Sequence, residues 1–296
     1  DTNSPANALQ FDPLCNDAKT GKKGGTAQAI VNSREDRLKS DPDRLYGVMM
    51  CTAMYLEMWN TYAQVGDVLY TKTYRLGWGN VYSRFIEEEQ ECMDLAWQSA
   101  APRPFMWVPE RFKFRGRFLE LGEMRILSWM AVMSGARGIR YHFWKNKRPN
   151  PFEGCPWLKS GMKAFNEEMA VRRADLSELT PVASEDVRVE QGGCEIRTAM
   201  LSGRGALIFI RNLDYHVDPL SSKVDGDKNL SVESKTNVTV TIPLPSWFSP
   251  GSSTDYLTGK TVKSRKVKAG TGVDLEMDKL EQYRLVWLPN RKWRGK

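Results

Sequence analysis

The stretch that decides the fold runs from Arg103 to Lys145 and reads RPFMWVPERF (103–112), KFRGRF (113–118), LELGEMRILSWMAVMSGA (119–136) and RGIRYHFWK (137–145). It predicts a short apolar strand, an amphipathic helix, a glycine-bounded turn and a second apolar strand. The turn that begins at Ser134-Gly135 ends the helix, because glycine accepts the left-handed conformation that a helix end needs. The stretch therefore predicts two strand–helix units of a parallel α/β sheet.

The residues before this stretch repeat the same alternation. Leu45–Thr52 is a continuous apolar run, as expected for a strand buried on both faces, and Asp67–Tyr74 is the next strand candidate. Helices are predicted over residues 26–39, 54–65 and 81–100, whereas residues 1–25 read as a polar loop. Four strands that alternate with helices predict a parallel sheet in which consecutive strands are neighbours.

The number of strands predicts half of a barrel. A closed (β/α)8 barrel of the TIM type needs eight strands and about 200 residues or more. Because only four strands are predicted and the chain starts within a loop, we expect residues 1–181 to form the carboxyl-terminal half of such a barrel, with a helix over 162–179 closing it. A four-stranded open sheet is the structural alternative.

After Val182 the pattern changes to strands. The segments EIRTAML, GALIFIRNL, NVTVTIPLP and QYRLVWL have strand length and are separated by clusters of Gly, Asp, Ser and Pro. Within the third, Val238, Val240 and Ile242 alternate with polar residues or proline. We expect residues 182–296 to form an antiparallel β-sandwich, so the predicted class is α/β plus all-β.

Composition and charge restrict the function classes. The chain has 296 residues, 41% of them hydrophobic and 27% charged, as in ordinary soluble proteins. The formal net charge is +7, with basic runs at Lys260–Lys268 and Arg291–Lys296. No nucleic-acid reader motif accompanies these runs, so a solvated surface or an anionic polymer partner is the simpler interpretation. No apolar run is long enough to span a membrane.

Cysteine usage predicts neither a metal site nor a redox site. The five cysteines are isolated and form no C-x-x-C pair, and we expect no cofactor and no metal. The ten Trp, ten Tyr and 11 Phe are a rich supply of aromatic rings, of which most are expected in the core. Such rings also serve as flat platforms in sugar-binding clefts.

The quoted stretch resembles the last two βα units of clan A glycoside hydrolase barrels, in which a nucleophilic Glu ends strand seven and a Trp ends strand eight. Asp41-Pro42-Asp43-Arg44 resembles the phrase before strand five of that clan, and Asp255-Tyr256-Leu257-Thr258-Gly259-Lys260 resembles the D-x-x-T-G-K hairpin of the C-terminal β-domain. The resemblance implies a retaining hydrolase of poly- or oligosaccharides, extracellular or periplasmic. It also implies that the acid/base Glu precedes Asp1, so that this piece is inactive alone.

Glu110 is the candidate nucleophile. It follows Trp107-Val108-Pro109 at a predicted strand end, where barrel enzymes carry their chemistry. A retaining glycosidase needs two carboxyl groups about 5–5.5 Å apart, one attacking the anomeric carbon and one transferring a proton. Arg111 would keep Glu110 ionised. The alternative is a surface Glu in a strand-end loop.

The substrate-binding candidates are aromatic and basic side chains at strand ends: Trp144, His142, Tyr74, Trp107 and Lys72. By resemblance Trp144 forms the floor of the sugar subsite, with packing at the barrel rim as the alternative. His142 is favoured over Tyr141 because it shares strand parity with Trp144. His216, further along the chain, is expected to be structural or solvated.

Three hypotheses remain open at this stage. The first is a carbohydrate-active enzyme, and the second is a non-catalytic carbohydrate-binding or structural protein with a degenerate barrel. The third is a surface protein that binds polyanions through its basic second domain. The expected partners are a carbohydrate substrate and either the missing half of the same barrel or a second copy of the chain, since open strand edges recruit other chains.

Overall fold

The computed structural model describes residues 9–11, 27–51, 59–72, 85–109, 119–141, 156–182, 189–217, 230–267 and 272–293. The chain divides into two compact units, of which the first comprises residues 1–160 with 219–224. The second comprises 161–218 with 225–296. This division falls within helix α5 (Pro156–Val171), and the predicted domain boundary after residue 181 stays a prediction.

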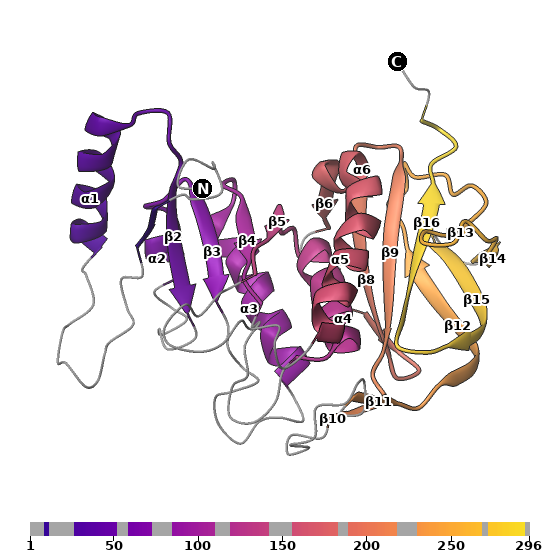
Figure 1. Ribbon diagram of the computed structural model, residues 1–296. Coiled ribbons are helices and arrows are strands. Elements are labelled where there is room, and N and C mark those ends of the chain that lie inside the picture. The colour runs from indigo at the N-terminus through magenta and orange to yellow at the C-terminus, as the bar shows by residue number, and fades with distance from the viewer. Residues whose placement is uncertain are drawn as a thin grey trace. The chain divides into compact units, whose positions relative to one another are not determined.

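The first unit contains a parallel sheet whose strands follow chain order (Figure 1). The strands are β1 (Leu9–Phe11), β2 (Tyr46–Cys51), β3 (Val68–Lys72), β4 (Phe105–Trp107) and β5 (Gly138–Ile139), and each pairs in parallel with the next. The predicted parallel sheet is therefore confirmed. The expectation of an all-loop segment over residues 1–25 is wrong, because β1 lies there and adds a strand beside β2.

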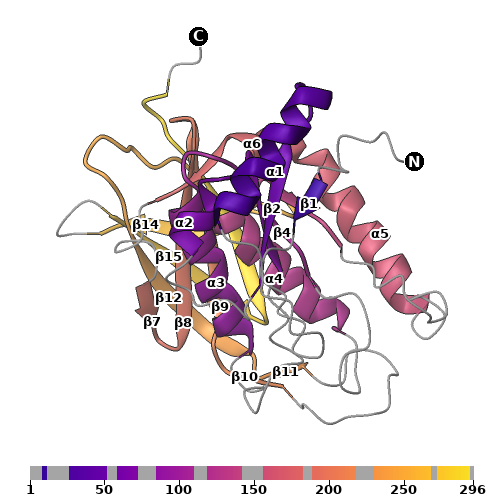
Figure 2. The same cartoon turned by 90° about the vertical axis from the view of Figure 1, so that its left-hand side faces the viewer.

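Helices alternate with these strands: α1 (Ala27–Ser40), α2 (Trp59–Ala63), α3 (Phe85–Ala100) and α4 (Leu121–Met133). Helices α2 and α3 lie beside each other and pack against β2, β3 and β4 (Figure 2). Apolar residues of α3 at three- and four-residue spacing, such as Cys92, Met93 and Ala96, are buried. The apolar residues whose spacing predicted this helix thus form the face that it buries.

The ends of α4 follow the sequence signals. At its start the backbone N–H of Glu120 donates to the carboxylate of Glu123 at 2.9 Å, one half of a capping box. At its end Gly135 has a φ of 95°, the left-handed conformation expected after the helix. Glu120 and Glu123 therefore cap the start of α4 instead of forming a catalytic pair.

The second unit begins with helical residues that were predicted as one helix over 162–179. That prediction is wrong, because α5 ends at Val171 and α6 (Arg173–Glu178) starts anew after Arg172, whose φ of −101° and ψ of 5° leave the helical range. The Arg172 guanidinium lies 5.4 Å from the ring centre of Tyr256 and donates to the Leu257 carbonyl at 3.0 Å. Arg172 thus joins the helical break to the turn that follows β13.

The strands of the second unit form antiparallel sheets. The larger has the order β13-β16-β9-β8-β6, with β7 also on β8, and the smaller has the order β12-β15-β14, while β10 and β11 form a separate pair. Their bounds are β6 Leu179–Pro181, β7 Val189–Gln191, β8 Cys194–Leu201, β9 Gly205–Asn212, β10 Tyr215–Val217, β11 Leu230–Val232, β12 Lys235–Pro243, β13 Thr254–Asp255, β14 Lys263–Lys266, β15 Gly272–Leu280 and β16 Tyr283–Pro289.

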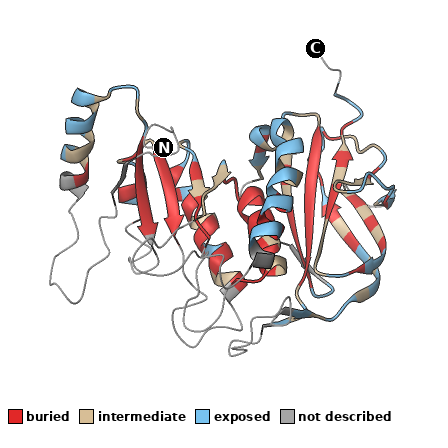
Figure 3. Ribbon diagram, in the orientation of Figure 1, coloured by how far each residue is buried: buried red, intermediate tan, exposed pale blue. Residues whose placement is uncertain are grey.

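One hydrophobic core joins the two larger sheets. Alternate residues of β8, β9 and β16 contribute from one sheet, and alternate residues of β12 and β15 contribute from the other. In β12 this face consists of the predicted series, with Val240 and Ile242 buried and Val238 packed against the cluster. Strand β9 is buried along its whole length, unlike β15, which alternates (Figure 3).

Candidate active site

The parallel sheet presents an apolar face that leads toward the carboxyl ends of its strands. Met49, Val68, Tyr70 and Val108 form one buried cluster, with Met106 packed against it. We call this side of the sheet the cluster face. Because side chains alternate along a strand, residues two positions further along each strand lie on the same face. Polar groups on this face at the carboxyl ends of the strands are where barrel enzymes carry their chemistry.

Lys72 is the last residue of β3 and lies on the cluster face, two residues after Tyr70. It is only 8% exposed. Lysine is rarely buried to this extent, because removing its ammonium group from water is costly. Lys72, predicted from the sequence to end a strand, does end β3 and is buried there.

Arg140 is a residue of this site that the sequence interpretation missed. It follows β5 directly, and its backbone N–H donates to the Trp107 carbonyl at 2.8 Å. Its guanidinium carbon lies 5.3 Å from the ring centre of Tyr70, a cation–π distance. The signal was available, since Arg140 has the same strand parity as His142 and Trp144. Through its contact with Tyr70, Arg140 brings a second cationic side chain to the cluster face, in addition to Lys72.

Trp107, a predicted substrate contact, has its side chain turned away from this cluster. It alternates with Met106 in β4, it is 1% exposed, and its indole N–H donates to the Glu89 carboxylate of helix α3 at 3.3 Å. The ring therefore packs between sheet and helix in this structure. Its predicted contact with sugar stays a prediction.

The remaining predicted site residues, Glu110, Trp144, His142 and Tyr74, lie outside the described residues. Within the described ranges no cluster of three or more acidic, cysteine or histidine side chains could hold a metal ion. No described helix is both long enough and apolar enough to cross a membrane. His216, on β10, is exposed.

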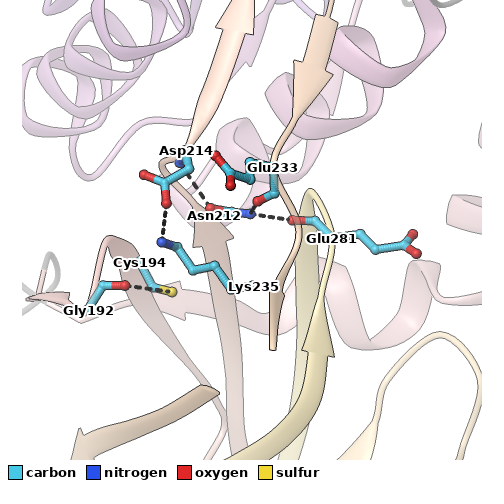
Figure 4. A network of polar contacts seen from close by, with 7 residues as sticks. All are labelled: Gly192, Cys194, Asn212, Asp214, Glu233, Lys235 and Glu281. Carbon is cyan, nitrogen blue, oxygen red and sulfur yellow. Dashed lines mark hydrogen bonds and ion pairs between the residues drawn. The ribbon is translucent and has the colours of Figure 1, made fainter. Parts of the chain in front are cut away.

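A polar network in the second unit centres on the buried Asn212 (Figure 4). Its side-chain amide donates to the carbonyl groups of Glu233 at 2.8 Å and Glu281 at 2.9 Å, and its side-chain oxygen accepts the Asp214 N–H at 2.9 Å. Three chain segments far apart in sequence are thus held by one side chain. Lys235 forms an ion pair with Asp214 at the exposed edge of this network.

The Cys194 thiol beside this network is not a nucleophile candidate. It is buried, and its S–H points to the Gly192 carbonyl at a sulfur–oxygen distance of 3.9 Å (Figure 4). Burial raises the pKa of the Cys194 thiol, which disfavours the reactive thiolate. Cys92 is also a buried free thiol, as expected from its apolar surroundings in the sequence.

Strands β8 and β9 hold a second group of buried charges. Glu195 accepts from Arg197 Nε at 3.1 Å and from Arg211 Nε at 2.7 Å, and all three residues are at most 1% exposed. Glu195 and Arg211 are directly opposite each other in the strand pair. A carboxylate so enclosed by two guanidinium groups has no free approach for a substrate, and we assign it to structure.

Comparisons with known proteins find solved structures that are similar over both the parallel and the antiparallel part of the chain. No protein-family model and no curated protein matches the sequence. Solved structures do match: an α-amylase of Geobacillus thermoleovorans aligns over 92% of this chain with a TM-score of 0.53 and 12% identity. A Paenibacillus sp. cycloisomaltooligosaccharide glucanotransferase aligns over 88% with a TM-score of 0.53 and 8% identity. A GH27 β-L-arabinopyranosidase of Geobacillus stearothermophilus aligns over 90% with a TM-score of 0.50 and 10% identity.

The chain spans 55–59% of the length of these three proteins. At identities of 8–12% the likeness concerns the fold and not the activity. The resemblance inferred from the Arg103–Lys145 stretch is confirmed at this level. The chain has a fold similar to that of glycoside hydrolases.

Proposed function

We propose that this chain is the carboxyl-terminal part of a glycoside hydrolase, with half of a (β/α)8 barrel in its first domain and a β-sandwich in its second. The proposed substrate is a poly- or oligosaccharide, and the proposed reaction retains the anomeric configuration. The observation that carries the proposal is one chain-ordered parallel sheet followed by antiparallel sheets with a common core. Three carbohydrate-active enzymes share this fold over most of the chain.

The proposed nucleophile is Glu110. In sequence it has the parity of Met106 and Val108, which belong to the cluster face, and it follows β4 at the carboxyl end. In a retaining mechanism its carboxylate attacks the anomeric carbon while an acid protonates the leaving oxygen, and water then hydrolyses the glycosyl-enzyme. We propose that the acid/base carboxyl group comes from outside this chain.

Lys72 and Arg140 support this assignment through their charge. Both lie toward the carboxyl end of the cluster face. Cations within about 4–6 Å of a carboxylate favour its ionised form, which is the form that attacks. The ammonium group of Lys72 would also donate hydrogen bonds to sugar hydroxyl groups. In this proposal Trp144 and His142 complete the sugar subsite with Tyr74.

A second candidate function is carbohydrate binding without turnover. One observation favours it: among the described residues of the cluster face, Lys72 and Arg140 are charged and none is a carboxylate. Such a face would bind sugars that carry acidic groups even if no nucleophile were present. The two functions differ in whether turnover depends on Glu110.

The experiment compares Glu110→Gln with the wild type in the longest natural chain that contains these residues. Glutamine keeps the size of the side chain but cannot form the glycosyl-enzyme. We expect binding of the glycan to persist and the rate to fall about a thousandfold or more. Glu167→Gln, which changes an exposed carboxylate of α5, is the matched control and should keep the rate.

Two outcomes would reject the enzymatic proposal. One is a Glu110→Gln variant that retains more than about a tenth of the wild-type rate, which corresponds to a barrier change under about 1.4 kcal/mol. The other is a wild type that binds glycans but turns none over, in which case carbohydrate binding takes its place. The isolated 296-residue chain is expected to show no turnover of aryl glycosides by itself.

A further inference from the structure

Two tryptophan side chains of the second unit are open to solvent. Trp247 is 51% exposed and Trp293 is 48% exposed. Tryptophan is usually more buried than this, and exposed large aromatic residues are enriched at binding surfaces. Neither residue belongs to the parallel sheet or to the site described above.

The backbone segments that carry the two tryptophans are hydrogen-bonded to each other. Pro250 and Asn290 form an antiparallel bridge, and the Arg291 N–H donates to the Ser249 carbonyl at 2.7 Å. Trp247 precedes Ser249 by two residues and Trp293 follows Arg291 by two residues. The two aromatic residues therefore stand on neighbouring turns.

The side chain of Asn290 fixes both turns. It is 8% exposed, accepts the Ser249 N–H at 3.1 Å and the Lys292 N–H at 3.2 Å, and donates to the Gly203 carbonyl at 3.0 Å. It thus joins the β8–β9 turn at Gly203 to both tryptophan turns. A site held in this way loses little conformational entropy on binding.

Each indole rests on the protein on one side. The ring of Trp247 lies 5.8 Å from the ring of the buried Phe248, and Cδ1 of Trp293 would lie 3.9 Å from a Cβ atom at Gly203. About half of each residue is covered and the other half faces solvent. The exposed half of each indole offers apolar aromatic surface on which a pyranose ring could pack.

The charged residues that precede Trp293 in sequence are positive. Arg291 and Lys292 lie in sequence between Asn290 and Trp293, and both are exposed. The basic run at Lys260–Lys268 differs, because Lys263 pairs with Asp278 and Arg265 pairs with Asp274 and Glu276. Two cations of that run, Lys263 and Arg265, are thus paired with acidic residues of β15, whereas Arg291 and Lys292 are exposed cations next in sequence to Trp293.

We propose that Trp247, Trp293, Arg291 and Lys292 form a binding site for an acidic polysaccharide, separate from the site on the parallel sheet. Pyranose rings pack on the two indoles, and carboxylate groups of uronic acid units pair with Arg291 and Lys292. A single-stranded nucleic acid would also combine stacking with cations. We favour a glycan, because Lys263 and Arg265 of the neighbouring basic run are already paired with β15 and would bind a phosphate backbone less strongly.

The test measures binding of the wild-type chain to polygalacturonate by affinity gel electrophoresis and by calorimetry, with dextran as neutral glycan and oligo-dT as nucleic acid. Trp247→Ala and Trp293→Ala should each weaken polygalacturonate binding about tenfold, which corresponds to about 1.4 kcal/mol. Arg291→Gln combined with Lys292→Gln should weaken it similarly and remove most of its salt dependence. Val171→Ala, at an exposed apolar residue of α5, is the matched control.

Circular dichroism of each variant checks that the fold is kept. Unchanged affinity in both tryptophan variants would overturn the site, as would equal binding of dextran and polygalacturonate. Tighter binding of oligo-dT would replace the glycan by a nucleic acid. Because the measurement involves no turnover, loss of this site and failure of the proposed catalytic role of Glu110 give different results.

Discussion

The cluster face of the first unit and the antiparallel strands of the second unit place polar side chains in different surroundings. In the parallel sheet the described polar groups of the cluster face, Lys72 and Arg140, lie toward the carboxyl ends of strands, next to a cluster of apolar residues. In the antiparallel unit the buried Glu195 is enclosed by two arginines, and Asn212 is saturated by backbone groups of three segments.

This difference predicts which polar residues contribute to ligand binding and which contribute to the stability of the fold. A polar group whose bonds are all made within the protein adds to stability and specificity of the fold but has nothing left for a ligand. Charged groups at the carboxyl end of a parallel sheet are where such folds carry their chemistry. We therefore expect substitutions at Glu195 and Asn212 to change stability, and those at Lys72 to change sugar binding.

The largest effect on stability is expected at Glu195. Glu195→Gln removes the charge between Arg197 and Arg211, which are 1% exposed and would then repel each other. Removing one partner of a buried ion pair costs about 3–5 kcal/mol. Urea unfolding followed by circular dichroism should show this loss. A change below about 1 kcal/mol would mean that the cluster is hydrated in solution.

A smaller loss is expected at Asn212. Asn212→Ala leaves the Glu233 and Glu281 carbonyls and the Asp214 N–H without their partner. Two or three lost hydrogen bonds in a buried position cost about 2–4 kcal/mol. The control is Lys235→Ala at the exposed ion pair with Asp214, which should cost about 0–1 kcal/mol in the same urea experiment. Equal losses in the two variants would contradict the network.

The polar contacts around Glu195 and Asn212 could not be predicted from the sequence, whereas the order of helices and strands could. Apolar runs of strand length predicted β2 and β9, strand-length segments between turn residues predicted β3 and β8, and apolar residues at helical spacing predicted α3. Periodicity does not tell which charged residues of two strands meet. Glu195 and Arg211 pair only because the register of β8 and β9 places them opposite each other.

The missed elements have physical reasons. Strand β1 has only three residues, too few to establish a period, and it pairs with β2. Strand β14 (Lys263–Lys266) is exposed at every position and has no apolar pattern. Strand β15 did carry a signal, since Val273, Leu275 and Met277 alternate with acidic residues. The Asp255–Lys260 phrase is a turn, in which the Asp255 carboxylate accepts the backbone N–H groups of Leu257 and Thr258.

Substitution of Lys72 should lower the affinity for the glycan without lowering the stability of the fold. Lys72→Met keeps the length and the apolar stem of a side chain that is 8% exposed, and we expect the fold to be kept. The variant loses a charged hydrogen-bond donor at the carboxyl end of β3, so affinity for the glycan should fall about tenfold. Calorimetry with the wild type and the variant measures this. A variant that unfolds, or one that binds equally well, would contradict the assignment of Lys72 to the site.

The smallest effect depends on pH. Burial, together with the neighbouring Asp175 carboxylate, raises the pKa of Tyr256 to about 12 from 10.0. Because the folded state favours the neutral phenol, its contribution is present below pH 10 and is lost as the pH rises through 12. Partial exposure limits this contribution to about 1 kcal/mol. Urea midpoints at pH 8 and pH 11 should therefore differ less in Tyr256→Phe than in the wild type.

The most direct test is to identify the residue that becomes covalently linked to sugar. A 2-deoxy-2-fluoro glycoside with an activated leaving group slows the second step and needs little help from an acid/base group, so the glycosyl-enzyme accumulates. The longest natural chain containing these residues is treated with it, digested and analysed by mass spectrometry. We expect a single label on Glu110, absent in Glu110→Gln. A label on another carboxylate, or none on a chain that hydrolyses glycosides, would contradict it.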